Sequence, residues 1–181
     1  MSKNALIICV IVFILTIALT VSGIVVLRIR NVKSNEDKSV CTEQLSTQPS
    51  ISFTKFEGTP SIVDFTTLPE AKTFYTSITN IVSQGSNFAG HFTLVSWGCG
   101  TDCVGYAVVN TMNGEIIAYN PVNGDYHLGN FTVDDNVFTL NPVHAGQERK
   151  FFQLIERSSN SYQLILACTE LSSEEMYGLP E

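Results

Sequence analysis

HFTLVSWGCGTDCVGYAVVN, residues 91–110, places two strand-like segments on either side of a turn with paired cysteines. If residues 100–102 form the tip of a hairpin, Cys99 faces Cys103 directly. Facing Cα atoms in antiparallel strands lie about 4.5–5.5 Å apart, a separation that a disulfide accepts. The stretch therefore predicts a structural bridge between Cys99 and Cys103.

The same register fixes which side chains share a face of this hairpin. Trp97 lies over Gly105, where an indole covers the backbone that glycine leaves bare. Leu94 and Tyr106 point to the opposite face, and both faces are largely apolar. Such a hairpin belongs in the centre of a sheet that is covered on both sides.

One helix is expected before the hairpin. TLPE at 67–70 offers Thr67 as an N-cap and Glu70 three residues later, the spacing of a capping box. Gly85 is expected to end this helix. Apolar residues recur between them at steps of three and four, namely Ala71, Phe74, Tyr75, Ile78, Ile81 and Val82.

From residue 88 onward the apolar period is two, and turn residues interrupt it at short intervals. Asn113-Gly114 is typical of a type I′ hairpin turn. The later strands are expected at residues 115–120, 131–133, 137–140, 149–156 and 161–168. The fold class is therefore α+β in residues 51–181: an antiparallel meander sheet with one helix packed on a face.

The N-terminus predicts a membrane anchor. Residues 5–27 contain no charge and no proline, and at about 1.5 Å per residue a helix of this length crosses a hydrocarbon core of about 30 Å. A cleaved signal peptide is the alternative, although its apolar region is normally about 7–15 residues long. We expect an anchor in residues 1–30 and a flexible polar tether in residues 31–50.

Charge and cysteine content bear on partners and compartment. From residue 36 onward there are 17 acidic and 6 basic residues, a balance that disfavours nucleic acid as a partner. Arg28, Arg30 and Lys33 alone favour a cytoplasmic domain. Beyond the anchor, however, four cysteines fit two bridges in an oxidising compartment, and we therefore expect an exported domain. The four are Cys41, Cys99, Cys103 and Cys168, with Cys41 expected to pair with Cys168.

A cysteine-dependent enzyme is the competing interpretation. His91 precedes Cys99 by eight residues, about 26 Å along a continuous strand, whereas a general base must come within about 3 Å. His127 and His144 lie on expected turns and remain candidate bases. A usual zinc site needs a second close pair of ligands, which isolated cysteines do not provide. The Asn and Asp residues that cluster at the expected turns are explained by turn geometry, which favours these residue types without a metal. No metal and no cofactor is predicted.

His91 has two interpretations. In the first, His91 lines a ligand pocket, and Trp97 and Tyr106 are further candidate ligand-binding residues. In the second, His91 hydrogen-bonds to a loop carbonyl and holds the connection between the helix and the sheet in place.

The stretch NFAGHFTLVSWGCGTDC, residues 87–103, resembles a group of small exported bacterial proteins that share N-F-A-G-H-aromatic and W-G-C-G-x-x-C motifs. The resemblance covers about the middle third of the chain. It implies export and a paired-cysteine hairpin, and it assigns no catalytic residue. Members of the group mostly carry ordinary export signals, so the long apolar segment is a departure.

These features predict a binding or interaction module on the extracytoplasmic side of a cytoplasmic membrane. The expected partners are the membrane, through residues 5–27, and another envelope protein. The alternative is an envelope hydrolase or thiol oxidoreductase that uses Cys99 or Cys103.

Overall fold

The computed structural model describes residues 40–46, 53–144 and 146–172. The chain divides into two compact units, Met1–Glu43 and Gln44–Glu181. The expected anchor at residues 5–27 lies outside the described residues, and no helix within the described ranges is long and apolar enough to cross a membrane. A short helix, α2 (Val40–Ser46), lies within the segment expected to be a flexible tether. Seven residues are too few to display the apolar period that would predict a helix.

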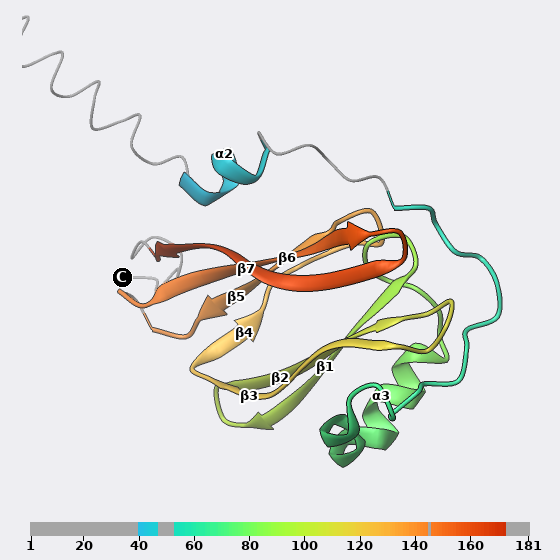
Figure 1. Ribbon diagram of the computed structural model, residues 1–181. Coiled ribbons are helices and arrows are strands. Elements are labelled where there is room, and N and C mark those ends of the chain that lie inside the picture. The colour runs from blue at the N-terminus through green and yellow to red at the C-terminus, as the bar shows by residue number, and fades with distance from the viewer. Residues whose placement is uncertain (1–39, 47–52, 145, 173–181) are drawn as a thin grey trace, which may run out of the picture. The chain divides into compact units, whose positions relative to one another are not determined.

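The strands form two antiparallel sheets instead of the single meander that the sequence predicts (Figure 1). Strand order follows the sequence within each sheet, so the meander order is confirmed. The chain leaves the first sheet and starts the second at Asp125, which has φ +60°. The first sheet contains β1 (Phe92–Gly100), β2 (Cys103–Asn110) and β3 (Ile116–Gly124). The second contains β4 (Tyr126–Leu128), β5 (Val137–Pro142), β6 (Glu148–Ser158) and β7 (Ser161–Leu171).

One face of the first sheet packs on the second sheet. Tyr106 and Phe138 meet edge to face with centroids 5.2 Å apart, and Phe138 stacks on Phe152 at 5.3 Å. Burial raises the pKa of Tyr106 to about 12. The buried side chains of this core are Phe88, Ala89, Phe92, Leu94, Val104, Tyr106, Val108, Phe138, Leu140 and Leu154.

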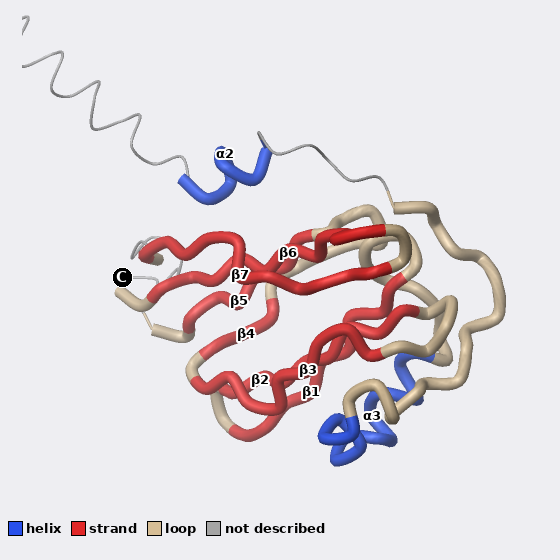
Figure 2. The backbone as a smooth tube through the Cα atoms, in the orientation of Figure 1, coloured by secondary structure: helices blue, strands red, loops and turns tan. Residues whose placement is uncertain are grey.

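The other face of the first sheet is covered by helix, which produces three layers (Figure 2). The expected helix begins as a 3-10 segment, η1 (Pro69–Phe74), and continues as α3 (Tyr75–Val82). Its apolar stripe is confirmed except at Tyr75, which is 52% exposed. The buried side chains of this layer are Val63, Ala71, Ile78, Val82, Val95, Ala107, Val109 and Ile116.

The expected cap at Thr67 is wrong. The Thr67 hydroxyl donates to the Asp64 carbonyl at 2.8 Å and accepts the backbone N–H of Ile116 at 3.1 Å. Leu68 precedes the 3-10 segment with no side-chain cap. Thr67 thus links the segment that precedes the helix to β3. A threonine hydroxyl can hydrogen-bond to any backbone group that the fold places nearby, so it is not restricted to capping a helix.

The expected register of the central hairpin is confirmed at Trp97 and Gly105, which pair across β1 and β2. Direct pairing of Cys99 with Cys103 is wrong, because a bulge after Gly98 makes Gly100 the partner of Cys103. The disulfide still joins Cys99 to Cys103, with Cα atoms 5.1 Å apart.

The structure tests the predicted turns after β2 and β6 and the strand predicted at residues 131–133. Only Gly114 has positive φ, +80°, in the β2–β3 turn, so this turn is not type I′. Residues 131–133 form no strand; the Val133 carbonyl instead accepts the N–H of Gly90 at 2.7 Å. The β6–β7 hairpin is confirmed, with Asn160 at φ +62° in its turn.

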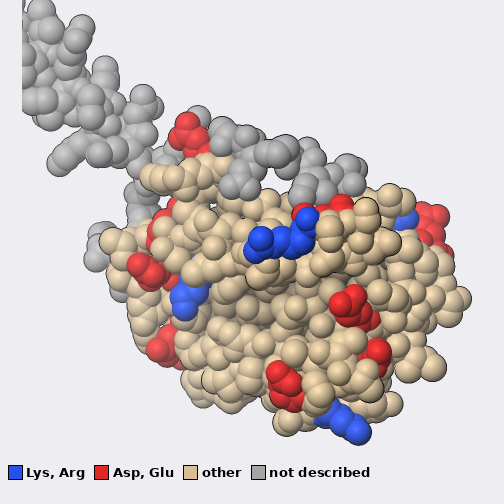
Figure 3. Space-filling view, viewed as in Figure 1, with Lys and Arg blue, Asp and Glu red and all other residues tan. Residues whose placement is uncertain are grey.

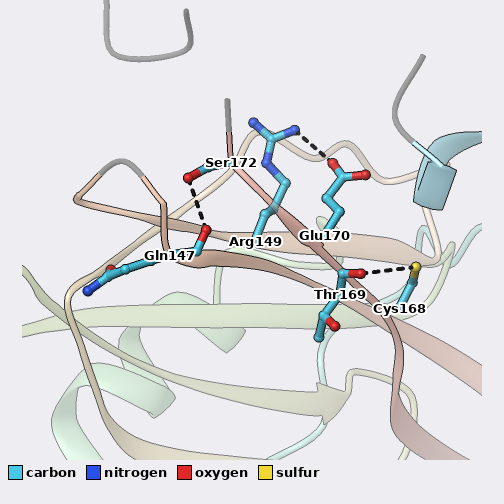
Figure 4. A network of polar contacts seen from close by, with 6 residues as sticks. All are labelled: Gln147, Arg149, Cys168, Thr169, Glu170 and Ser172. Carbon is cyan, nitrogen blue, oxygen red and sulfur yellow. Dashed lines mark hydrogen bonds and ion pairs between the residues drawn. The ribbon is translucent and has the colours of Figure 1, made fainter. Parts of the chain in front are cut away.

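The open ends of β6 and β7 are joined by side chains as well as by the strand ladder (Figure 4). Arg149 Nη1 lies 3.5 Å from Glu170 Oε1, and the Ser172 hydroxyl donates to the Gln147 carbonyl at 3.0 Å. These contacts fix the end of the hairpin remote from its Asn160 turn.

Candidate binding pocket

The NFAGH stretch is a connector between the helix and β1. The Asn87 side chain accepts the N–H of Leu94 at 2.8 Å and donates to the Leu94 carbonyl at 3.1 Å. The amide therefore pairs with the outer edge of β1 as a neighbouring strand would. This pairing fixes the direction in which the following residues leave the strand.

Ala89 and Gly90 both adopt positive φ, +43° and +71°. Their N–H groups donate to the carbonyls of Asp135 and Val133, at 2.9 and 2.7 Å. A Cβ on Gly90 would lie 2.7 Å from the Phe53 carbonyl oxygen, so glycine permits this close approach. The turn places the next residue, a histidine, at the end of the two sheets.

His91 is 6% exposed. Its Nδ1 donates to the Thr54 carbonyl at 3.3 Å, and its ring lies 4.3 Å from Phe92 and 5.5 Å from Tyr162 by centroid. Burial lowers the pKa of His91, although the Thr54 bond and the charge of Glu156 oppose this effect. With Nδ1 protonated in the neutral ring, Nε2 carries a lone pair.

His91 also lines a surface pocket of about 550 Å³, a volume in the range of small-molecule sites. The pocket is built from the segment before the helix, the connector that precedes β1, the end of β2, the β2–β3 and β6–β7 turns and the start of β7. None of its lining residues is charged. They are Thr54, His91, Asn110, Met112, Asn113, Asn160 and Tyr162.

Some polar atoms of the pocket already have partners. Asn110 Oδ1 accepts the N–H of Met112 at 3.0 Å, and Asn113 Oδ1 accepts the N–H of Glu115 at 3.0 Å. In the described part of the chain, Nε2 of His91 and Nδ2 of Asn110 make no hydrogen bond. The side-chain amide of Asn160 also makes no hydrogen bond with the described residues, so the pocket offers a strong acceptor on His91, a donor on Asn110 and an amide on Asn160 that both donates and accepts.

An acidic group lies beside the pocket. The Glu156 carboxylate accepts the N–H of Asn160 at 3.2 Å. Its charge raises the pKa of both His91 and Tyr162, a smaller effect than burial in each case. On the face shown in Figure 3, acidic side chains are interspersed with lysine and arginine side chains. The Glu156 carboxylate therefore contributes a negative potential beside the pocket.

The three candidate ligand residues do not share one cavity. Trp97 stacks on Phe74 with centroids 4.3 Å apart in the helix layer, and Tyr106 lies in the core between the sheets. Only His91 reaches the pocket, and it also bonds the loop carbonyl of Thr54. Sequence reasoning missed Tyr162 and Asn160, whose only sequence signal is a polar turn between two strands.

Among the described residues, the cysteines and the remaining histidines form no assembled catalytic pair. Cys99 and Cys103 are bonded to each other, and Cys41 and Cys168 are also disulfide-bonded. His127 Nε2 lies 3.9 Å from Asp102 Oδ1 at the hairpin tip. Within the described ranges, no group of three or more His, Cys, Asp or Glu residues is placed to hold a metal ion.

Comparison of the chain with protein-family models, curated proteins and solved structures found no match. The fold and the pocket therefore define the class: a disulfide-bonded α+β domain with an uncharged pocket at one end of its two sheets.

Proposed function

We propose that this protein is a membrane-tethered, extracytoplasmic binding module whose ligand site is the pocket around His91. The observation that carries the proposal is the set of unpaired polar atoms in a preformed, uncharged pocket. The ligand is a free small molecule or a group displayed on another envelope component.

The location proposed for the domain is supported by its disulfides. Disulfides form and persist in oxidising compartments. The apolar segment at residues 5–27 supplies the proposed tether. Antibody labelling of a C-terminal epitope tag on intact bacterial spheroplasts tests this. Labelling that requires permeabilisation of the membrane would contradict it.

The binding role is tested on the full chain in detergent by NMR. The probe is a library of neutral, cationic and anionic compounds of low molecular mass, and the readout is the imidazole signal of His91. A His91→Gln variant identifies that signal among the three histidines of the chain. We expect at least one compound to shift it, with no shift of the His127 signal. A library that leaves the His91 signal unchanged would overturn the role.

A thiol oxidoreductase is the second candidate, favoured by the disulfide at the hairpin tip and by His127 beside Asp102. In that reaction a substrate dithiol is oxidised to a disulfide while the Cys99–Cys103 bridge is reduced to two thiols, and both protons pass to those thiols. The hydrolase alternative needs a free sulfur on Cys99 or Cys103, and the bridge between them occupies both. Oxidation of a reduced dithiol peptide by the full chain, absent in Cys103→Ser, would favour the oxidoreductase over the binding module.

A further inference from the structure

We propose that the pocket binds a neutral, hydroxyl-rich ligand, a sugar residue of an uncharged glycan. This inference rests on the binding role proposed above for the same pocket. It follows from the charge, the unpaired polar atoms and the aromatic surface of the pocket.

Charge excludes anionic ligands first. No lysine or arginine lines the pocket, so a phosphate or carboxylate has no counter-charge there. The Glu156 carboxylate, held by the Asn160 N–H, adds a negative potential beside it. An anion entering the pocket would lose its hydration without a compensating partner.

The unpaired polar atoms then favour hydroxyl groups. The Thr54 carbonyl occupies Nδ1 of His91, which leaves Nε2 as an acceptor. The Met112 N–H occupies Oδ1 of Asn110, which leaves Nδ2 as a donor. A hydroxyl both donates and accepts, so adjacent hydroxyls of one sugar satisfy both atoms.

The apolar part of the lining suits the C–H face of a sugar ring. Tyr162 presents an aromatic ring that is held in place by edge-to-face contacts with Phe92 at 4.8 Å and His91 at 5.5 Å. Met112 adds an adaptable apolar side chain and is 54% exposed. A peptide that adds a strand to a sheet binds by main-chain pairing with the sheet edge, whereas the unpaired groups here belong to side chains.

The test uses the full chain in a detergent without a sugar headgroup. The probes are chitotriose and maltotriose, which are neutral, and tri-galacturonic acid, which is anionic. We expect a neutral trisaccharide to shift the His91 imidazole signal with a dissociation constant of about 1 mM or below, while the anionic one does not.

Matched variants then locate the sugar. Asn160→Gly removes an amide from the pocket and keeps a backbone of φ +62°, whereas Asp125→Gly removes a side chain at φ +60° outside the pocket. We expect Asn160→Gly to weaken binding about fivefold, the loss of one hydrogen bond, and Asp125→Gly to leave it within about twofold. Equal effects of the two variants would overturn the inference.

Other outcomes separate the two proposals. If no neutral trisaccharide binds, or if the anionic one binds as well, the sugar inference fails. The binding role survives that failure if another library compound shifts the His91 signal. If neither sugars nor library compounds shift it, both proposals fail together.

Discussion

Trp97 covers Gly105 across the β1–β2 ladder so closely that no side chain can be added there. A Cβ on Gly105 would overlap the Trp97 indole and the Pro121 carbonyl. The indole Nε1 donates to that same carbonyl at 3.3 Å, which holds the ring in place. The glycine is therefore part of the packing between β2, β3 and the helix layer.

Gly105→Ala is expected to destabilise the domain by about 1–3 kcal/mol, because the indole and β3 must both move to admit a methyl group. Urea unfolding followed by Trp97 fluorescence measures the change. Gly98→Ala is the matched control in the same hairpin, since its added Cβ would meet no atom within 4 Å. Equal destabilisation by both variants would show that Trp97 is not fixed against Gly105.

Asn87→Ala is expected to expose the outer edge of β1. It removes both hydrogen bonds to Leu94, and unpaired, partly buried backbone groups cost about 1–3 kcal/mol. The amide of Leu94 should exchange with deuterium faster in the variant. Asn113→Ala, in an exposed turn where water replaces the lost bond, should change neither stability nor the exchange of Leu94.

Thiol labelling should find at most one free cysteine in the unreduced chain. The chain has five cysteines, and Cys41, Cys99, Cys103 and Cys168 are disulfide-bonded. After export and denaturation without reductant, intact mass should show at most one maleimide adduct, and five after reduction. Two or more adducts before reduction would contradict the disulfide assignment and the oxidising compartment.

Stability should fall with acid because of His91. Burial lowers the pKa of His91 below the ordinary 6.5, so the unfolded chain binds a proton that the folded one does not. The stabilisation is complete above pH 6.5 and is lost as the pH falls from there toward the folded pKa. Relative to the wild type, His91→Gln should reduce the dependence of the free energy of unfolding on pH between 5 and 7. His127→Gln changes an exposed side chain and should keep the pH dependence of the wild type. Identical pH profiles for the wild type and His91→Gln would show that His91 does not cause the loss of stability in acid.

The pairing of Trp97 with Gly105, the Cys99–Cys103 bridge and the position of the helix could be predicted from the sequence. Each depends on residues close together in the chain, where strand alternation and helical periodicity constrain the structure directly. The bulge after Gly98 could not be predicted, because an extra residue at a turn leaves the alternating pattern on either side unchanged.

The division into two sheets and the pocket required the tertiary structure. An apolar face of a sheet does not specify whether a helix or a second sheet will cover it. Here the second sheet covers one face of β1 and β2, and the helix covers the other. The pocket joins His91 to Asn110, Asn160 and Tyr162, which lie up to 71 residues apart in the sequence. The sequence by itself determined local pairing and burial, whereas only the packing of distant turns decided which polar atoms stay unpaired and face a common cavity.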